Sequence, residues 1–255
     1  MNPPISQSLK KNVTRKTSFK KWRTWRNRLR HEFFNLLVQQ RHYYELAAIT
    51  KPYIGTETAW ELARSMAQAY AAFAFTAIRR IAEFPRSSTR KSKEIVSLPT
   101  LLRDVQANAH LITRTHLRRR YKKKMKHLSE RIYNNAADRV FDAVSNGNDV
   151  LRAGSVEKDL RLIERTVKRI CKLTDKVYAH VERDCRRIPK KLGFDKADDV
   201  INTLLGILRK YSLCLFGDEV ILPPFESLSV ANDLRKIWPS DEPLPDFPSP
   251  VEEEP

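Results

Sequence analysis

Residues 155–184 read SVEKDLRLIERTVKRICKLTDKVYAHVERD, and their apolar side chains recur at steps of three and four. This spacing lines one face of an α-helix with hydrophobic groups and leaves the charged groups on the other face. The apolar stripe consists of Val156, Leu160, Ile163, Val167, Ile170, Val177 and Val181. Ser155 is a suitable N-terminal cap, and Pro189 ends the pattern. A long amphipathic helix is therefore predicted, and it must bury its stripe against other helices.

Similar patterns occur in most of the remaining chain. Further helices are expected at about 18–48, 56–84, 97–109 and 196–214. The chain contains only 6 glycines, and its interior segments are rich in Ala, Leu, Arg and Lys, which favour helices. The sequence thus predicts an all-α protein, an antiparallel bundle of four to five long helices.

Composition divides the chain into three parts. Residues 1–17 are predicted to be a disordered basic tail that begins an N-terminal extension, because residues 1–30 hold ten Lys or Arg and no acid. Residues 18–238 are predicted to form the helical domain. Residues 239–255 contain six Pro and six acids without Lys or Arg, so a disordered acidic, Pro-rich tail is expected.

Aromatic residues alternate with cations in the N-terminal helix, and two interpretations of this pattern remain open. In the first, Trp22 and Trp25 pack on the core while the cations of the helix stay solvated. In the second, the helix is a nucleic-acid arm, with cations on the phosphates and aromatic rings stacked on bases.

The net charge of +18 and the pI near 10.0 favour a polyanionic partner. Seven of the nine residues Arg118–Lys126 are basic, and they form either a solvated helix face or a phosphate-contacting stripe. We predict RNA as the partner. The predicted nucleic-acid-binding residues are Arg118, Arg119, Arg120, Lys122, Lys123, Lys124, Arg183 and Arg187.

Several other classes of protein find no support. The three cysteines form no Cys-x-x-Cys pair, and the spacing of His110 and His116 does not suit zinc, so no metal site is predicted. Glycine-rich phosphate loops are absent, and no cofactor is expected. The chain lacks a run of 18 apolar residues, so we expect no membrane span and a reducing, cytoplasmic location.

His180 is the candidate for chemistry. It falls about 100° from the centre of the apolar stripe at 100° per residue, hence at the edge of a surface. Lys176 and Arg183 lie one turn to either side and can attract a phosphate. Histidine exchanges protons near neutral pH, as general acid/base cleavage of RNA requires. The plainer alternative is a histidine with a structural role.

The segment LTDKVYAHVERD (173–184) resembles the C-terminal helix of the HEPN superfamily, in the branch of the abortive-infection systems of the U type. That branch commonly has Arg, a polar residue, Lys, two apolar residues, Ala and His. Other segments in the same order resemble it: AFAFTAIRRIAEF (72–84), SLPTLLRDV (97–105), INTLLGILRKYSLCLFGDEV (201–220) and the terminal RKIW. The resemblance covers roughly residues 45–238.

This resemblance implies a bundle of four or five helices, commonly dimeric, with metal-independent ribonuclease activity in many members. His180 is then the general acid/base, and Asp175 is the polar residue that orients the site. Implied partners are RNA, a second copy of the chain and an antitoxin protein.

One position departs from the family. Thr174 stands where the branch has its Arg. A neutral hydroxyl does not stabilise a developing phosphorane charge as a guanidinium does. Either another cation serves, with Lys176 as the candidate and Arg79 or Arg80 as alternatives, or the domain is an inactive module that binds RNA or a protein.

Overall fold

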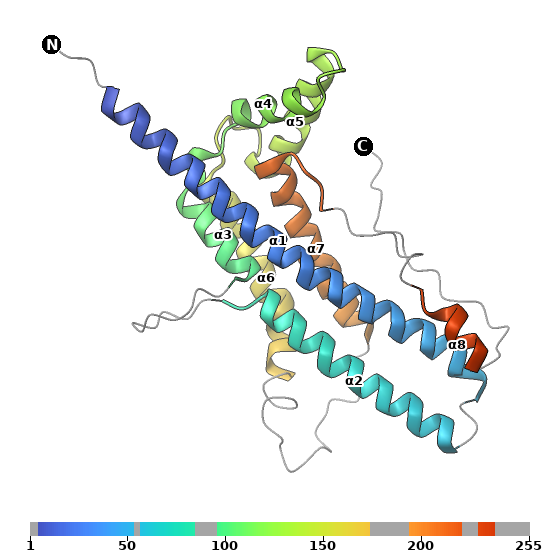
Figure 1. The fold of residues 1–255 in the computed structure, drawn as a ribbon. Coiled ribbons are helices and arrows are strands. Elements are labelled where there is room, and N and C mark those ends of the chain that lie inside the picture. The colour runs from blue at the N-terminus through green and yellow to red at the C-terminus, as the bar shows by residue number, and fades with distance from the viewer. Residues whose placement is uncertain (1–4, 54–56, 85–95, 174–193, 221–228, 238–255) are drawn as a thin grey trace. The chain divides into compact units, whose positions relative to one another are not determined.

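The structure is a computed structural model, and it describes residues 5–53, 57–84, 96–173, 194–220 and 229–237 (Figure 1). Within those ranges the chain forms helices and connecting loops and no β-strand, which confirms the predicted all-α class. The helices are α1 (Ile5–Thr50), α2 (Glu57–Ile81), α3 (Leu98–Ala107), α4 (Arg114–Lys124), α5 (Glu130–Ser145), α6 (Ala153–Leu173), α7 (Phe194–Phe216) and α8 (Ala231–Ile237). None of these helices is long and apolar enough to cross a membrane.

The chain divides into two compact units, and each is described by itself. Unit 1 comprises Met1–Arg30, Arg80–Arg169 and Asp198–Val220. Unit 2 comprises His31–Arg79, Ile170–Ala197 and Ile221–Pro255.

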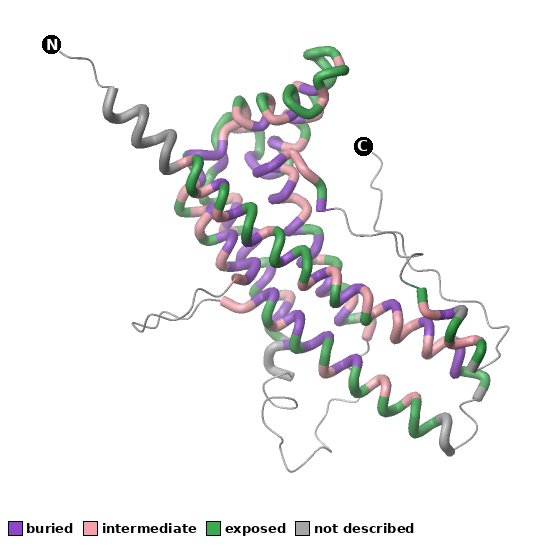
Figure 2. The backbone as a smooth tube through the Cα atoms, viewed as in Figure 1, coloured by how far each residue is buried: buried purple, intermediate pink, exposed green. Residues whose placement is uncertain are grey.

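The core of unit 1 joins α1, α3, α5, α6 and α7. Figure 2 shows buried positions recurring along one face of these helices, as amphipathic patterns require. The fully buried side chains of this unit include Trp22, Leu29, Leu98, Leu101, Phe141, Tyr211 and Phe216.

The aromatic face of α1 packs in this core. Trp22 is 0% exposed and Trp25 is 4% exposed. The indole Nε1 of Trp22 donates to Asp104 Oδ2 at 2.6 Å, and Lys21 Nζ donates to the other carboxylate oxygen at 2.9 Å. The packing interpretation is therefore confirmed for the two tryptophans, which are not free to stack on bases.

The start of α3 is as the sequence predicts. Ser97 is the N-cap, and its Oγ accepts from the Thr100 backbone N–H at 3.3 Å. The same hydroxyl lies 2.6 Å from the carbonyl oxygen of Glu83, to which it donates. Pro99 occupies the first turn, where a missing N–H costs nothing.

Three helix boundaries differ from the sequence-based expectation, and one tryptophan is unexpectedly exposed. Helix α1 already begins at Ile5, within the predicted tail, because no Gly or Pro interrupts residues 5–51. Helix α6 begins at Ala153, before the expected cap Ser155. Helix α4 ends at Lys124, inside the basic run. Trp60, in the first turn of α2, is 48% exposed although its large apolar ring would suit the core.

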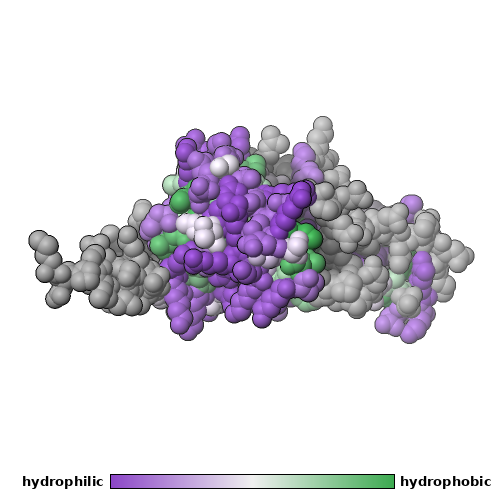
Figure 3. All heavy atoms as spheres, turned by 90° about the horizontal axis from the view of Figure 1, so that it is seen from above, coloured by the Kyte–Doolittle hydropathy of each residue, from purple (hydrophilic) through white to green (hydrophobic). Residues whose placement is uncertain are grey.

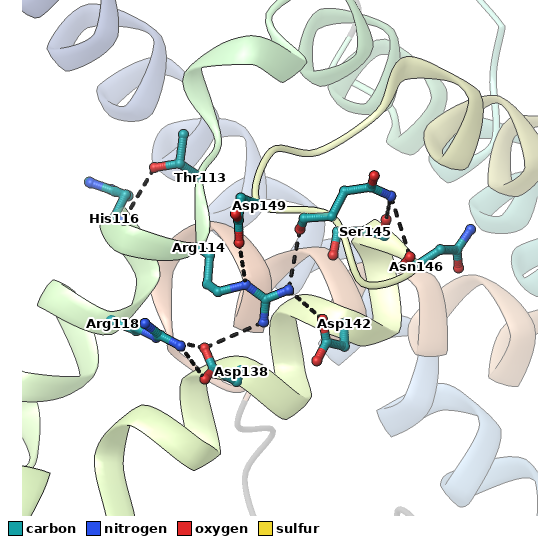
Figure 4. Close-up of polar contacts among 10 residues, drawn as sticks. Thr113, Arg114, His116, Arg118, Asp138, Asp142, Ser145, Asn146 and Asp149 are labelled. Atoms are coloured by element: carbon teal, nitrogen blue, oxygen red, sulfur yellow. Dashed lines mark hydrogen bonds and ion pairs between the residues drawn. The ribbon is translucent and has the colours of Figure 1, made fainter. Parts of the chain in front are cut away.

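An arginine on α4 fixes this helix to α5 (Figure 4). Arg114 makes ion pairs with Asp142 at 2.5 Å, Asp149 at 3.0 Å and Asp138 at 3.4 Å. Its guanidinium also lies over the Phe141 ring. These carboxylates raise the pKa of Arg114 above its usual value, with the hydrogen bond to Asp142 as the largest cause. The ion pairs thus set the position from which α4 presents its cations.

A second polar group holds α6 against α7 within unit 1. Asp159 is 8% exposed and accepts from the Tyr211 hydroxyl at 2.7 Å and from Lys210 Nζ at 2.9 Å. A buried carboxylate needs such donors, because an unpaired charge in the core is costly.

Unit 2 contains a buried ion pair and an aromatic cluster. Glu45 is 0% exposed, accepts from Arg41 Nε at 2.6 Å and accepts from the backbone N–H of Val230 at 2.9 Å, just before α8. Tyr43 stacks on Tyr70 with ring centroids 4.5 Å apart. These contacts order the second half of α1 beside α2 and α8.

Candidate nucleic-acid interface

The predicted catalytic segment lies outside the described residues. Residues 174–193 include Thr174, Asp175, Lys176 and His180, together with the predicted RNA contacts Arg183 and Arg187. The alternative cations Arg79 and Arg80 lie in the last turn of α2. Their roles toward His180 remain predictions.

The basic run on α4 divides into two groups. Arg119, Lys122 and Lys123 are exposed. The other three cations are engaged within unit 1, each by a different partner. Figure 3 shows the molecule from above relative to Figure 1, and on this face hydrophilic residues cover most of the described surface. The predicted stripe is therefore available to a polyanion at only some of its positions.

The engaged cations have distinct partners. Arg118 pairs with Asp138 through its Nε at 2.7 Å. Lys124 Nζ donates to the carbonyl oxygen of Gly217 at 2.9 Å and pairs with the neighbouring Asp218. Arg118 and Lys124, both predicted to contact phosphates, are thus paired with groups of unit 1.

The third engaged cation, Arg120, belongs to a cluster on α1, α4 and the end of α7. We call it the arginine–phenylalanine cluster, and it consists of Arg15, Arg23, Arg26, Arg120, Phe19 and Phe216. The two phenylalanine rings meet edge to face, with centroids 6.3 Å apart.

The guanidinium groups lie over these two rings. The Cζ atoms of Arg15 and Arg120 are 5.8 and 5.1 Å from the Phe19 centroid. Around the Phe216 centroid, Arg26 lies at 4.7 Å, Arg23 at 5.6 Å and Arg120 at 5.7 Å. Four positive charges are thus gathered around a single pair of rings.

Negative charge is scarce in the arginine–phenylalanine cluster. Among the described residues its ion pairs involve one carboxylate, that of Asp218, which lies 3.5 Å from Arg26 Nη1 and also pairs with Lys124. Burial, followed by repulsion from Arg23, Arg15 and Arg26, lowers the pKa of Arg120. The pKa of Arg26 is likewise lowered by burial first and then by neighbouring arginines. Such a concentration of unneutralised charge favours the approach of an anion.

A neutral histidine adjoins the cluster. Arg120 Nε donates to His116 Nε2 at 2.8 Å, so this ring nitrogen carries no proton. The imidazole also packs against Phe19, with centroids 4.7 Å apart. Burial, and then the charges of Arg15, Arg120 and Arg119, lower the pKa of His116 to about 4. His116 therefore serves as a hydrogen-bond acceptor at neutral pH.

This histidine predicts a specific loss of stability in acid. The pKa of His116 is about 4 in the folded chain and about 6.5 when unfolded, so the unfolded chain binds more protons between these values. The free energy of unfolding should fall by about 1 to 2 kcal/mol from pH 7 to pH 5 on this account. Urea titrations at both pH values measure the loss.

His116→Gln is the control for this pH effect, because its amide oxygen can still accept from Arg120 but does not titrate. The variant should lose less stability than the wild type over the same interval. An identical pH dependence in both proteins would contradict the assignment.

The sequence indicated Arg120 but missed Arg15, Arg23, Arg26 and His116 as site residues. Arg15, Phe19, Arg23 and Arg26 do share one face of a helix by their spacing. That signal was present in the sequence. The approach of α4 and Phe216 to this face depends on tertiary packing.

A protein-family model described as AbiU2, HEPN_AbiU2, matches residues 19–234. No curated protein and no solved structure matches the chain.

Proposed function

This chain belongs to the AbiU2 branch of the HEPN superfamily, and we propose from that premise that it is an RNA-binding protein of an abortive-infection system. The observation that carries the proposal is the arginine–phenylalanine cluster, where four guanidinium groups surround two rings and only that of Arg26 is paired with a carboxylate within the described residues. RNA is the polyanion that suits such a surface in this family. We place the protein in the cytoplasm, with a second copy of the chain and an antitoxin protein as proposed partners.

Two sets of cations contribute to the proposed RNA surface. Arg119, Lys122 and Lys123 are exposed on α4 and add long-range attraction to phosphates. The arginine–phenylalanine cluster adds guanidinium groups held in place by rings. Phosphate contacts of this kind position an RNA without reading its sequence.

The proposed reaction is metal-independent cleavage of RNA, with His180 as general acid/base. The ribose 2′-hydroxyl loses its proton to a base, and its oxygen attacks the adjacent phosphorus. The bond from phosphorus to the 5′-oxygen breaks, and that oxygen takes a proton from an acid. The products are a 2′,3′-cyclic phosphate and a 5′-hydroxyl. Lys176 is proposed to stabilise the phosphorane charge and Asp175 to orient the site.

A second candidate function is a catalytically inactive HEPN domain that binds RNA or a protein. Thr174 favours it, because the family Arg is absent at that position. Both candidates share the RNA surface and differ in cleavage.

Salt-dependent RNA binding tests the shared part. The association constant of single-stranded RNA should fall linearly with salt on logarithmic axes, with a slope near −0.7 per neutralised phosphate. Lys122→Gln/Lys123→Gln should make the slope shallower by about 1.4, because two phosphate contacts are lost. Fluorescence anisotropy over a chloride series measures this slope.

The matched control for the slope is Arg152→Gln/Lys158→Gln. It removes two exposed charges, one just before α6 and one near the start of that helix. It should leave the slope nearly unchanged. Absence of RNA binding, combined with tight binding to vesicles of anionic phospholipid, would contradict the proposal and favour a membrane surface as the partner.

A further inference from the structure

We infer that the arginine–phenylalanine cluster is a built site for one phosphate group of the bound RNA, separate from the segment of His180. The inference deepens the proposed function and rests on it for the identity of the RNA. The ligand chemistry is a tetrahedral phosphate, either a terminal phosphomonoester or an internal phosphodiester.

Buried donors in the cluster lack partners. The Nε and Nη2 atoms of Arg15 are buried and have no hydrogen-bond partner. Arg120 lies over the same Phe19 ring as Arg15, and its Nε donates to His116 Nε2 at 2.8 Å. Buried unpaired donors are uncommon and unfavourable in folded proteins. The oxygens of a phosphate would accept from these groups and neutralise their charge.

The phenylalanine rings hold the guanidinium groups in position. Phe19 is 7% exposed and Phe216 is 1% exposed, so neither ring is available to stack on a base. Arg120 lies near both rings, and Arg26 lies 4.7 Å from the Phe216 centroid. Cation–π contacts reduce the freedom that an arginine must lose on binding. The cluster is therefore shaped to take a phosphate rather than a nucleobase.

The cluster also differs from an ordinary solvated basic face. The Arg26 side chain is 13% exposed, and Arg15 and Arg120 are also partly buried. On a solvated face, cations turn into water and are screened from one another. Here burial first, and then repulsion from nearby arginines, lowers the pKa of each of Arg15, Arg26 and Arg120. A bound dianion or monoanion would relieve this repulsion.

The test compares two pairs of substitutions that each remove two positive charges from the full-length chain. Arg15→Gln/Arg120→Gln alters the cluster, and Lys122→Gln/Lys123→Gln alters the exposed face. We expect the cluster pair to weaken RNA binding by about tenfold more than the exposed pair at the same ionic strength, because charge-assisted hydrogen bonds are lost. Equal losses would overturn the inference.

Inorganic phosphate provides a measurement that does not need RNA. Phosphate should raise the melting temperature of the wild type above that in chloride of equal ionic strength, because it binds the folded chain. The cluster pair should show no such rise. In phosphate-free buffer this variant should melt no lower than the wild type, since removing two charges relieves repulsion. A rise of equal size in both proteins would overturn the inference.

The outcomes separate this inference from the proposed function. Phosphate stabilisation that depends on the cluster, together with no RNA binding by the wild type, would sustain the site and contradict the RNA proposal. RNA binding by the wild type that is weakened equally by the two pairs of substitutions would support the RNA proposal and contradict the phosphate site. Matched oligonucleotides with a 5′-phosphate or a 5′-hydroxyl distinguish a terminal phosphate from an internal one, and either result supports the site.

Discussion

Replacing His180 with alanine is expected to lower metal-free RNA cleavage by about 10² to 10⁴-fold, the contribution of a positioned general acid/base. The imidazole is the only group in the proposed reaction with a usual pKa near neutrality. Alanine can neither take the proton of the 2′-hydroxyl nor return one to the leaving 5′-oxygen. Single-turnover rates with RNA in EDTA measure the loss, and 2′,3′-cyclic phosphate ends identify the reaction.

His31→Ala is the matched control, because His31 is exposed on α1 and lies outside the segment 173–184 that carries the proposed catalytic residues. It should cleave RNA at the wild-type rate. Cleavage that survives His180→Ala with the same cyclic ends would exclude His180 as the catalyst. Failure of all three proteins to cleave, with RNA binding intact, would establish the inactive binding module in its place.

Local patterns were sufficient to predict α1, α2, α3, α6 and α7, whereas α5 and α8 were not among the predicted helices. Ser97 begins α3 because a cap and a first-turn proline are encoded within four residues. Trp22 and Trp25 lie on the predicted face of α1 and are buried. The start of α1 was harder to predict, because a basic sequence without Gly or Pro suits both a helix and a solvated tail.

The division of the basic run on α4 shows why the site was only partly predictable. Periodicity places Arg118, Arg120 and Lys124 on a helix but says nothing of which acid will approach each one. Asp138 comes from α5 and Asp218 follows α7, so tertiary packing brings them to this helix. The same packing leaves Arg120 beside Phe216 and the arginines of α1. Composition predicted a polyanion, whereas the number of uncompensated cations depends on the fold.

Restoring the family guanidinium should have the opposite effect to removing His180. Thr174→Arg is expected to raise the rate of metal-free RNA cleavage by about 10² to 10³-fold, the usual contribution of one group that stabilises an oxyanion in the transition state. A guanidinium offers two parallel N–H donors to the phosphorane oxygens, and a threonine hydroxyl offers one neutral donor. The measurement is the single-turnover rate in EDTA with saturating RNA, so that tighter binding alone does not change it.

Two further variants separate this chemistry from the added charge. Thr174→Lys adds the same charge without the planar pair of donors and should recover only part of the gain. Thr174→Arg/His180→Ala should be nearly inactive, because a stabilised phosphorane still requires proton transfer. A rate unchanged by Thr174→Arg would mean either that Lys176 already supplies all of the charge stabilisation that the reaction needs or that the segment has lost its catalytic geometry. Lys176→Gln in the wild-type background distinguishes these cases, since only the first predicts a further loss of cleavage.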